Sequence, residues 1–134
     1  MKVFLAMNVI VSAFASRGLC ADLFREVLLR HQLVVSPELL DEVRSVLIKK
    51  IGIPSKLARE IVDLLEEAGV RSLPESGTAL SIQDPMDRAL VAAAIQSRAE
   101  VFVTGDKKLS EHAASVPLEM ATPRQFWVWL RAGG

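Results

Sequence analysis

The sequence has little of several features that define common classes of protein. Cys20 is the one cysteine among 134 residues, so an internal disulfide is excluded and a reducing cytoplasm is expected. The 16 basic and 16 acidic residues cancel, so no overall charge attracts nucleic acid or an anionic membrane. A polyanion would have to be bound by a local patch or by a metal. No apolar run reaches the length of a membrane span, and the first residues do not resemble a signal peptide. These absences favour one domain, residues 1–134, without membrane contact.

Two further classes of site are not supported by the sequence. Neither of the glycine-rich patterns G-x-x-x-x-G-K-[ST] and G-x-G-x-x-G is present, so binding of a nucleoside triphosphate or a dinucleotide has no support. His31 and His112 are far apart in the sequence, and with a single cysteine they cannot form a typical zinc site. We expect both histidines to be solvated.

What is present is an alternation of short apolar strands and amphipathic helices. Strands are predicted at residues 2–6, 32–35, 70–73, 101–103 and 118–121. Helices are predicted at residues 9–15, 21–30, 37–50, 55–68, 84–98, 107–114 and from 123 onwards, and residues 74–83 are predicted to form a loop. This order is typical of a parallel sheet with helices on both faces.

Helical spacing also predicts which apolar side chains face inward. In the helix at residues 55–68 the inward positions are Leu57, Ile61, Leu64 and Leu65. In the last helix the same spacing predicts that Trp127 and Trp129 are packing anchors, rather than residues on which nucleic-acid bases stack.

The strands at residues 2–6 and 101–103 are the most apolar, so they are expected side by side at the centre of the sheet. Their carboxyl ends would then bring Ala6 close to Asp106, at the edge where ligands bind in open α/β sheets. Asp106 is equally well explained as the cap of the helix after it. Asn8 is similarly a plausible cap of the helix that follows the first strand.

Two more acids could join Asp106. Glu42 flanks the apolar stripe of its helix, where a carboxylate can face the sheet edge or simply be solvated. Asp87 shares a helix face with Met86 and Leu90, the face expected to pack inward, and a buried carboxylate must be paired or bound to a cation. Asp84 and Asp87 also resemble a capping box, with Asp84 more typical of a cap than of a ligand. Carboxylates crowded together repel one another, so a cluster implies a hard divalent cation such as Mg²⁺ or Mn²⁺.

With these residues identified, nearly the whole chain resembles the PIN-domain family, in particular the small bacterial PIN proteins that act as ribonuclease toxins of toxin–antitoxin pairs. The resemblance depends on residues 3–13, 35–43, 84–87 and 103–106, in this order and spacing. It implies a three-layer α/β/α fold with a central, mostly parallel sheet of about five strands. It also implies Mg²⁺- or Mn²⁺-dependent endonucleolytic cleavage of RNA in the cytoplasm, with a cognate antitoxin and a homodimer.

The resemblance assigns roles to individual positions. The acids of the family match Glu42, Asp87 and Asp106, which would hold the metal and catalyse, while Asn8 and Thr104 match supporting polar positions, as does the cap Asp84. Lys107 and Lys108 are candidates for contacting the RNA backbone, or else solvated helix charges.

One position departs from the family. The first strand of the family normally ends in Asp, and here that catalytic position holds Ala6, which cannot bind a cation. Either this is a natural non-cleaving member, or the acid was replaced so that a toxic protein could be produced; alanine is the usual choice for such a replacement, which favours the second.

Three functions are therefore compared: a metal-dependent ribonuclease impaired at position 6, a non-catalytic PIN scaffold that binds an antitoxin or RNA, and a phosphoacceptor receiver domain. The last would need an acid cluster at the end of the first strand, which Ala6, Met7 and Asn8 do not supply.

Overall fold

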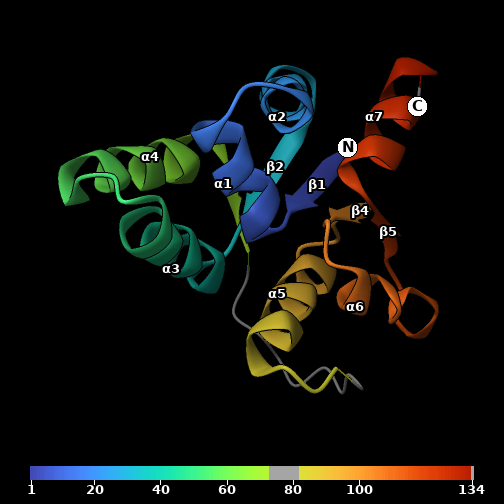
Figure 1. Ribbon diagram of the computed structural model, residues 1–134. Coiled ribbons are helices and arrows are strands. Elements are labelled where there is room, and N and C mark those ends of the chain that lie inside the picture. Colours follow the sequence, from blue (N-terminus) through green and yellow to red (C-terminus); the bar gives the residue numbers. More distant parts are fainter. Residues whose placement is uncertain (73–81, 134) are drawn as a thin grey trace.

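A parallel sheet forms the centre of the molecule (Figure 1), in a computed structural model that describes residues 1–72 and 82–133. Its strands are β1 (Lys2–Leu5), β2 (Gln32–Val35), β3 (Val70–Arg71), β4 (Val101–Val103) and β5 (Glu119–Ala121). Their order is β3-β2-β1-β4-β5, and every pairing is parallel. The predicted pairing of the first strand with β4 at the centre is confirmed.

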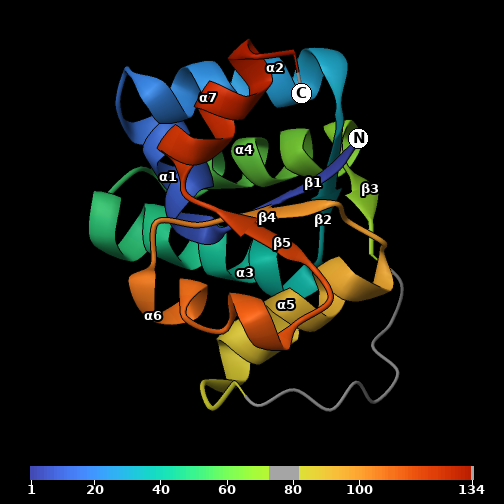
Figure 2. The ribbon, with the colours of Figure 1, turned by 90° about the vertical axis from the view of Figure 1, so that its right-hand side faces the viewer.

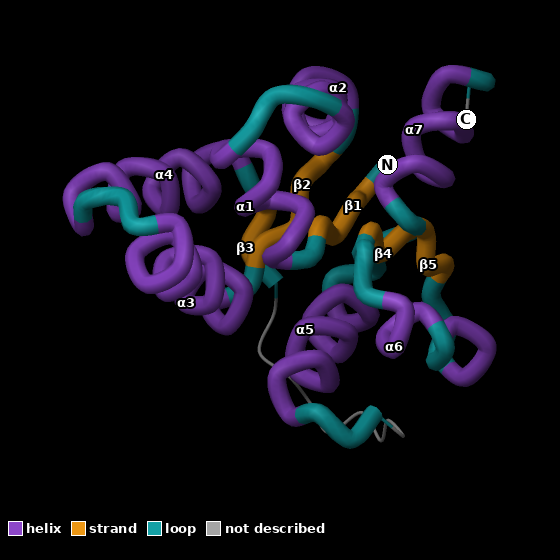
Figure 3. Tube along the Cα trace, in the orientation of Figure 1, coloured by secondary structure: helices purple, strands orange, loops and turns teal. Residues whose placement is uncertain are grey.

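Helices alternate with these strands, as the tube in Figure 3 shows. They are α1 (Met7–Ala15), α2 (Leu19–Arg30), α3 (Pro37–Val46), α4 (Ser55–Ala68), α5 (Pro85–Gln96), α6 (Lys107–Ser110) and α7 (Pro123–Arg131). A π-helical turn, Leu47–Ile51, continues α3, and a 3₁₀ turn, Ala113–Ser115, follows α6. Helices α2 and α7 lie on one side of the sheet, and α5 and α6 lie on the other (Figures 1 and 2). This confirms the predicted three-layer α/β/α architecture.

The two central strands are held together by their apolar side chains as well as by backbone hydrogen bonds. Phe4 and Phe102 are opposite each other in the pairing register, and their rings stack with centroids 4.9 Å apart and planes 10° apart. Both side chains are completely buried, and burying a phenylalanine contributes about 1.5–3 kcal/mol. This pairing fixes the relative height of β1 and β4, and therefore places the residues that follow them side by side.

Several local predictions were wrong. Asn8 does not cap α1, because the helix begins at Met7 and Ala6 occupies the cap position without a side-chain hydrogen bond. The helix predicted at residues 37–50 is α-helical only to Val46 and continues as the π-helical turn to Ile51. Gly52 follows that turn as its cap, with a φ of 83° in the left-handed region. The helix predicted at residues 107–114 ends at Ser110. Most of the predicted loop at residues 74–83, with the last residue of the third predicted strand, lies outside the described residues.

Some apolar side chains predicted to face inward are exposed. Leu57 and Leu64 are each 44% exposed and Trp129 is 47% exposed. Ala58 and Leu65 are the buried residues of α4. The inward face of α4 is thus narrower than the apolar stripe suggests.

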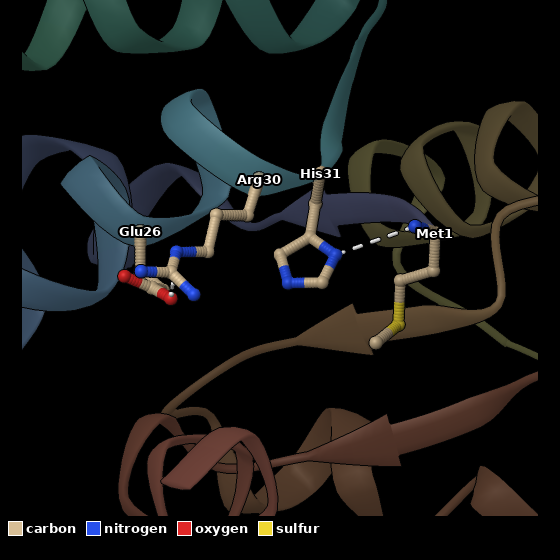
Figure 4. A network of polar contacts seen from close by, with 4 residues as sticks. All are labelled: Met1, Glu26, Arg30 and His31. Carbon is tan, nitrogen blue, oxygen red and sulfur yellow. Dashed lines mark hydrogen bonds and ion pairs between the residues drawn. The ribbon is translucent and has the colours of Figure 1, made fainter. Parts of the chain in front are cut away.

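His31 is half-buried, and not simply solvated as predicted. It caps the carboxyl end of α2, and its Nδ1 lies 3.3 Å from the terminal nitrogen of Met1 (Figure 4). Nearby, Arg30 Nε lies 3.2 Å from Glu26 Oε2. Burial first, and then the charge of the terminal amine, lower the pKa of His31.

Among the described residues, no single helix has both the length and the apolar character needed to cross a membrane. Helices α1 and α2 reach that length and composition only when taken together, and they are bent by 107° where they join.

Candidate acidic site at the carboxyl ends of the strands

The candidate site lies at the carboxyl ends of β1, β4 and β5, which are level with one another. The backbone N–H of Ala6 donates to the carbonyl of Val103 over 2.9 Å, and the N–H of Thr104 donates to the carbonyl of Ala121 over the same distance. Ala6 and Thr104 are both buried. The ends of β1, β4 and β5 therefore form one continuous edge, as the central placement of the two apolar strands implies.

A pocket of about 160 Å³ opens at this edge. Its lining residues are Ala6, Met7, Asn8, Glu42, Asp87, Leu90, Thr104 and Asp106. The three acids singled out in the sequence come from separate segments, namely α3, α5 and the turn between β4 and α6. The structure thus brings together Glu42, Asp87 and Asp106 around the methyl group of Ala6.

Glu42 is positioned by the start of α3. The buried Ser36 caps this helix by accepting the N–H of Leu39 over 3.1 Å, and Pro37 occupies the first turn. Leu39 and Val43 are fully buried, so Glu42 comes to the flank of the buried face. Burial raises the pKa of the Glu42 carboxyl, and the negative charges of neighbouring aspartates raise it further.

Asp87 lies in the first turn of α5, and its neighbour Asp84 makes the cap. Asp84 Oδ1 accepts the N–H groups of Met86 and Asp87 over 2.9 and 3.0 Å. Met86 is 37% exposed, contrary to the prediction that it faces inward with Asp87, whereas Leu90 is buried. Burial, followed by the charges of Asp84 and Asp106, raises the pKa of Asp87, and His112 acts in the opposite direction.

Asp106 caps a helix, as one of the two sequence interpretations expected, and it also lies at the pocket. Its Oδ1 accepts the N–H of Lys108 over 2.9 Å, which caps α6, and the residue also lines the pocket. Thr104 Oγ1 accepts the N–H of Asp106 over 3.1 Å and so holds the turn. A Cβ on Gly105 would lie 3.4 Å from Asn8 Nδ2, which is ordinary van der Waals contact and places the Asn8 amide beside this turn.

A second pocket of about 550 Å³ shares two acids with the first. Its lining residues are Ile82, Gln83, Asp84, Asp87, Asp106, Lys108, Leu109 and His112. His112 was predicted to be solvated and is instead half-buried beside the acids. The only sequence signal for it is its place six residues after Asp106, because the short α6 and the 3₁₀ turn have no periodic pattern.

A third, mostly apolar pocket of about 530 Å³ lies at the opposite ends of the strands, over β4, β5 and α7. Its lining includes Glu100, Glu119 and Trp129, and none of the acids that converge at the carboxyl edge. Pocket volume alone does not distinguish this pocket from the one of about 550 Å³ beside the acids, so the convergence of titratable groups is the better guide to a candidate site.

The donor atoms of the acidic site suit a hard cation. Glu42, Asp87 and Asp106 offer carboxylate oxygens, which Mg²⁺ and Mn²⁺ prefer. The pKa of Glu42 and Asp87 is raised first by burial and then by neighbouring negative charges, and a cation would relieve that second effect. In the described part of the chain, no three acidic, histidine or cysteine side chains already have the arrangement of a metal site. Ala6 supplies no ligand.

Comparisons with known proteins agree with this architecture. The fold is similar to a crystal structure of VapBC2 from Rickettsia felis bound to a DNA fragment from their promoter, with a TM-score of 0.63 and 13% identity over 91% of this chain and 98% of that chain. No curated protein matches the sequence. A family model described as PIN domain matches residues 2–108, which include β1 to β4 and all the acids of the two adjoining pockets. The chain therefore belongs to the PIN-domain family.

Proposed function

We propose that this protein is a PIN-type endoribonuclease that depends on Mg²⁺ or Mn²⁺ and is impaired by Ala6. The observation that supports this most directly is the pocket in which Glu42, Asp87 and Asp106 surround that alanine. PIN domains are generally nucleases, and the family model covers all four positions.

Each side chain has a distinct part in this proposal. Glu42, Asp87 and Asp106 would hold the cation, which when bound would activate a water and stabilise charge on the phosphate. Burial raises the pKa of both Glu42 and Asp87, so cation binding should weaken as the pH falls. Thr104 orients the Asp106 segment through its hydroxyl, and Asn8 offers an amide at the pocket wall.

Ala6 should affect both the activity and the stability of the protein. An aspartate there would add a fourth carboxylate at the end of the central strand, whereas the methyl group of Ala6 offers no oxygen to a cation. The same position is the cap of α1, where no side chain accepts a hydrogen bond. We therefore expect weak cation binding and slow or absent cleavage by the chain as it stands.

Restoring the acid tests the proposal, with the amide as a matched control. Ala6→Asp and Ala6→Asn have nearly the same shape and can both cap α1, but only aspartate adds a charge. A fluorescently labelled RNA would be incubated with each variant in Mn²⁺ and in EDTA. We expect cleavage by Ala6→Asp in Mn²⁺ alone, together with a larger Mn²⁺-induced rise in its melting temperature. Equal behaviour of the two variants would contradict the proposal.

We further propose that the protein acts as the toxin of a toxin–antitoxin pair in the cytoplasm, with a cognate antitoxin protein, an RNA substrate and a homodimeric state. The similar structure is described as VapBC2 bound to promoter DNA, and it supports the fold from which this proposal starts. Co-expression with the neighbouring open reading frame and copurification test the antitoxin, and light scattering tests the dimer.

A second candidate function is favoured by Ala6 itself. A PIN scaffold without its first acid could bind an antitoxin or RNA without cleaving it. In that case Ala6→Asp would remain inactive, and Mn²⁺ would not change the thermal stability of either variant. The two functions therefore predict opposite results in the same pair of experiments.

A further inference from the structure

The pocket that adjoins the acidic site is also lined by three carboxylates, those of Asp84, Asp87 and Asp106, but it adds basic and aromatic groups that the acidic site lacks. Of its eight lining residues, Lys108 is the one permanent cation and His112 contributes the one ring. Its volume of about 550 Å³ falls in the range of about 300–1,000 Å³ typical of pockets for small organic ligands. The smaller acidic pocket, at about 160 Å³, has room for little more than a cation and a phosphate group.

Backbone hydrogen bonds hold the basic wall of this pocket in place. The N–H of Lys108 is bound to Asp106 Oδ1, and the N–H of His112 donates to the carbonyl of Leu109 over 3.0 Å. The His112 carbonyl accepts both the hydroxyl and the N–H of Ser115, over 2.8 and 2.9 Å. Leu109 is buried beneath them. Lys108 and His112 are thus presented by a short, fixed segment rather than by a long exposed helix.

Asp87 and Asp106 belong to both pockets. A chain whose phosphate lies at the acids would therefore place its next nucleotide in the larger pocket. Polyanion binding beside several carboxylates requires a local cation, which Lys108 supplies. An unstacked base of a single strand binds on flat side chains, and histidine is one of these.

We propose that the side of this pocket formed by Gln83, Lys108, Leu109 and His112, away from its aspartates, is a subsite for the nucleotide next to the scissile phosphate of a single-stranded RNA. Lys108 would contact the backbone phosphate and His112 the base. This inference builds on the proposed ribonuclease function. It also assigns the RNA contact to Lys108 and not to Lys107, because Lys107 does not line either pocket.

An RNA-binding measurement tests the subsite. A fluorescein-labelled RNA of 12 nucleotides and random sequence is titrated with the Ala6 chain, and its anisotropy is measured in Mn²⁺ at several salt concentrations. We expect Lys108→Gln to weaken binding several-fold and to reduce the salt slope by about 0.7, the value for one phosphate contact on a single strand. Lys107→Gln should weaken binding less, and Lys56→Gln on α4 should leave it unchanged.

Two substitutions of His112, one without a ring and one with a ring, test its contact with the base. Removing a stacking side chain typically weakens binding by about fivefold or more, so we expect this loss from His112→Ala. His112→Phe keeps a flat ring and should retain most of the affinity. Melting temperatures close to that of the parent chain show that each variant is folded.

The outcomes separate this subsite from the reaction itself. In the Ala6→Asp background, the subsite variants should raise KM with little change in kcat, because they act on binding. If Ala6→Asp cleaves RNA but Lys108→Gln and Lys107→Gln behave alike, or His112→Ala binds as the parent does, the subsite is wrong and the nuclease stands. If Ala6→Asp does not cleave, the proposed function fails, whatever the binding results show. Absence of RNA binding up to millimolar protein overturns the subsite.

Discussion

The hydroxyl of the buried Thr104 accepts the backbone N–H of Asp106 over 3.1 Å. This bond joins the last buried position after β4 to Asp106, one of the two acids that line both pockets. Thr104→Val keeps the shape of the side chain but leaves that N–H without its acceptor, so we expect the free energy of unfolding to fall by about 1 kcal/mol. Chemical denaturation measures this change.

Thr104→Ser serves as the control for that prediction, because it keeps the hydroxyl while removing a methyl group. It should retain the response to Mn²⁺ of its parent in the Ala6→Asp background, whereas Thr104→Val should reduce it. A response to Mn²⁺ that is equal in both variants would show that the bond does not position Asp106.

Ala6→Asn is expected to stabilise the protein. Ala6 has φ −66° and ψ 160° at the cap position of α1, which suits a capping residue, yet its side chain has no acceptor. An asparagine there can accept a free N–H of the first turn, a gain of about 1 kcal/mol. Thermal and urea unfolding measure it, with Ala6→Val as a control that adds bulk but no acceptor. An unchanged stability of Ala6→Asn would contradict the expectation.

Glu42 should make the free energy of unfolding, measured in EDTA, fall as the pH rises. Burial and neighbouring aspartates raise the pKa of Glu42 above its ordinary value of 4.5. Between pH 4.5 and the raised pKa of the folded protein, the folded state therefore binds more protons than the unfolded state. Its contribution to stability is therefore complete below 4.5 and is lost as pH rises through the folded pKa. Glu42→Gln should remove this decline, measured by urea denaturation from acid to neutral pH. Parallel curves for the two proteins would oppose this account.

His31 should have the opposite effect on the pH dependence of the free energy of unfolding. Burial lowers its pKa in the folded protein from the ordinary value of 6.5, so the unfolded state binds more protons between the two values. Its contribution is present above 6.5 and is lost as pH falls through the lowered pKa. The titration of the ring, followed by NMR in the folded protein, and the flatter stability curve of His31→Gln check this. A ring that titrates above 6.5 would refute it.

The sheet was predictable because its strands are chemically simple. Phe4 and Phe102 belong to segments that are apolar on both faces, and only the centre of a helix-covered parallel sheet buries both. The closeness of Ala6 and Asp106 followed from the same topology, since parallel strands place their carboxyl ends at one edge. Asp87 was singled out instead by the inward face of its helix. The significance of Ala6, in contrast, came from the family resemblance and not from any physical property of an alanine.

The errors have physical causes that periodicity does not capture. Helical spacing marks Leu57 and Leu64 as one stripe, but α4 contacts α3, β2 and β3 with the side that carries Ala58 and Leu65. His112 was missed because it is brought to the acids by a short turn. The metal assignment stays a prediction, as does the role of each acid.

The cap made by Asp106 also has a dynamic consequence. One oxygen of its carboxylate is bound to the Lys108 N–H, so the rotamer of Asp106 is restricted when the protein folds and not when a ligand arrives. In the described residues no hydrogen bond restricts the side chain of Glu42 in this way. The same holds for the carboxylate of Asp87, so the entropy lost on ligand binding should fall mainly on Glu42 and Asp87 and less on the already ordered Asp106.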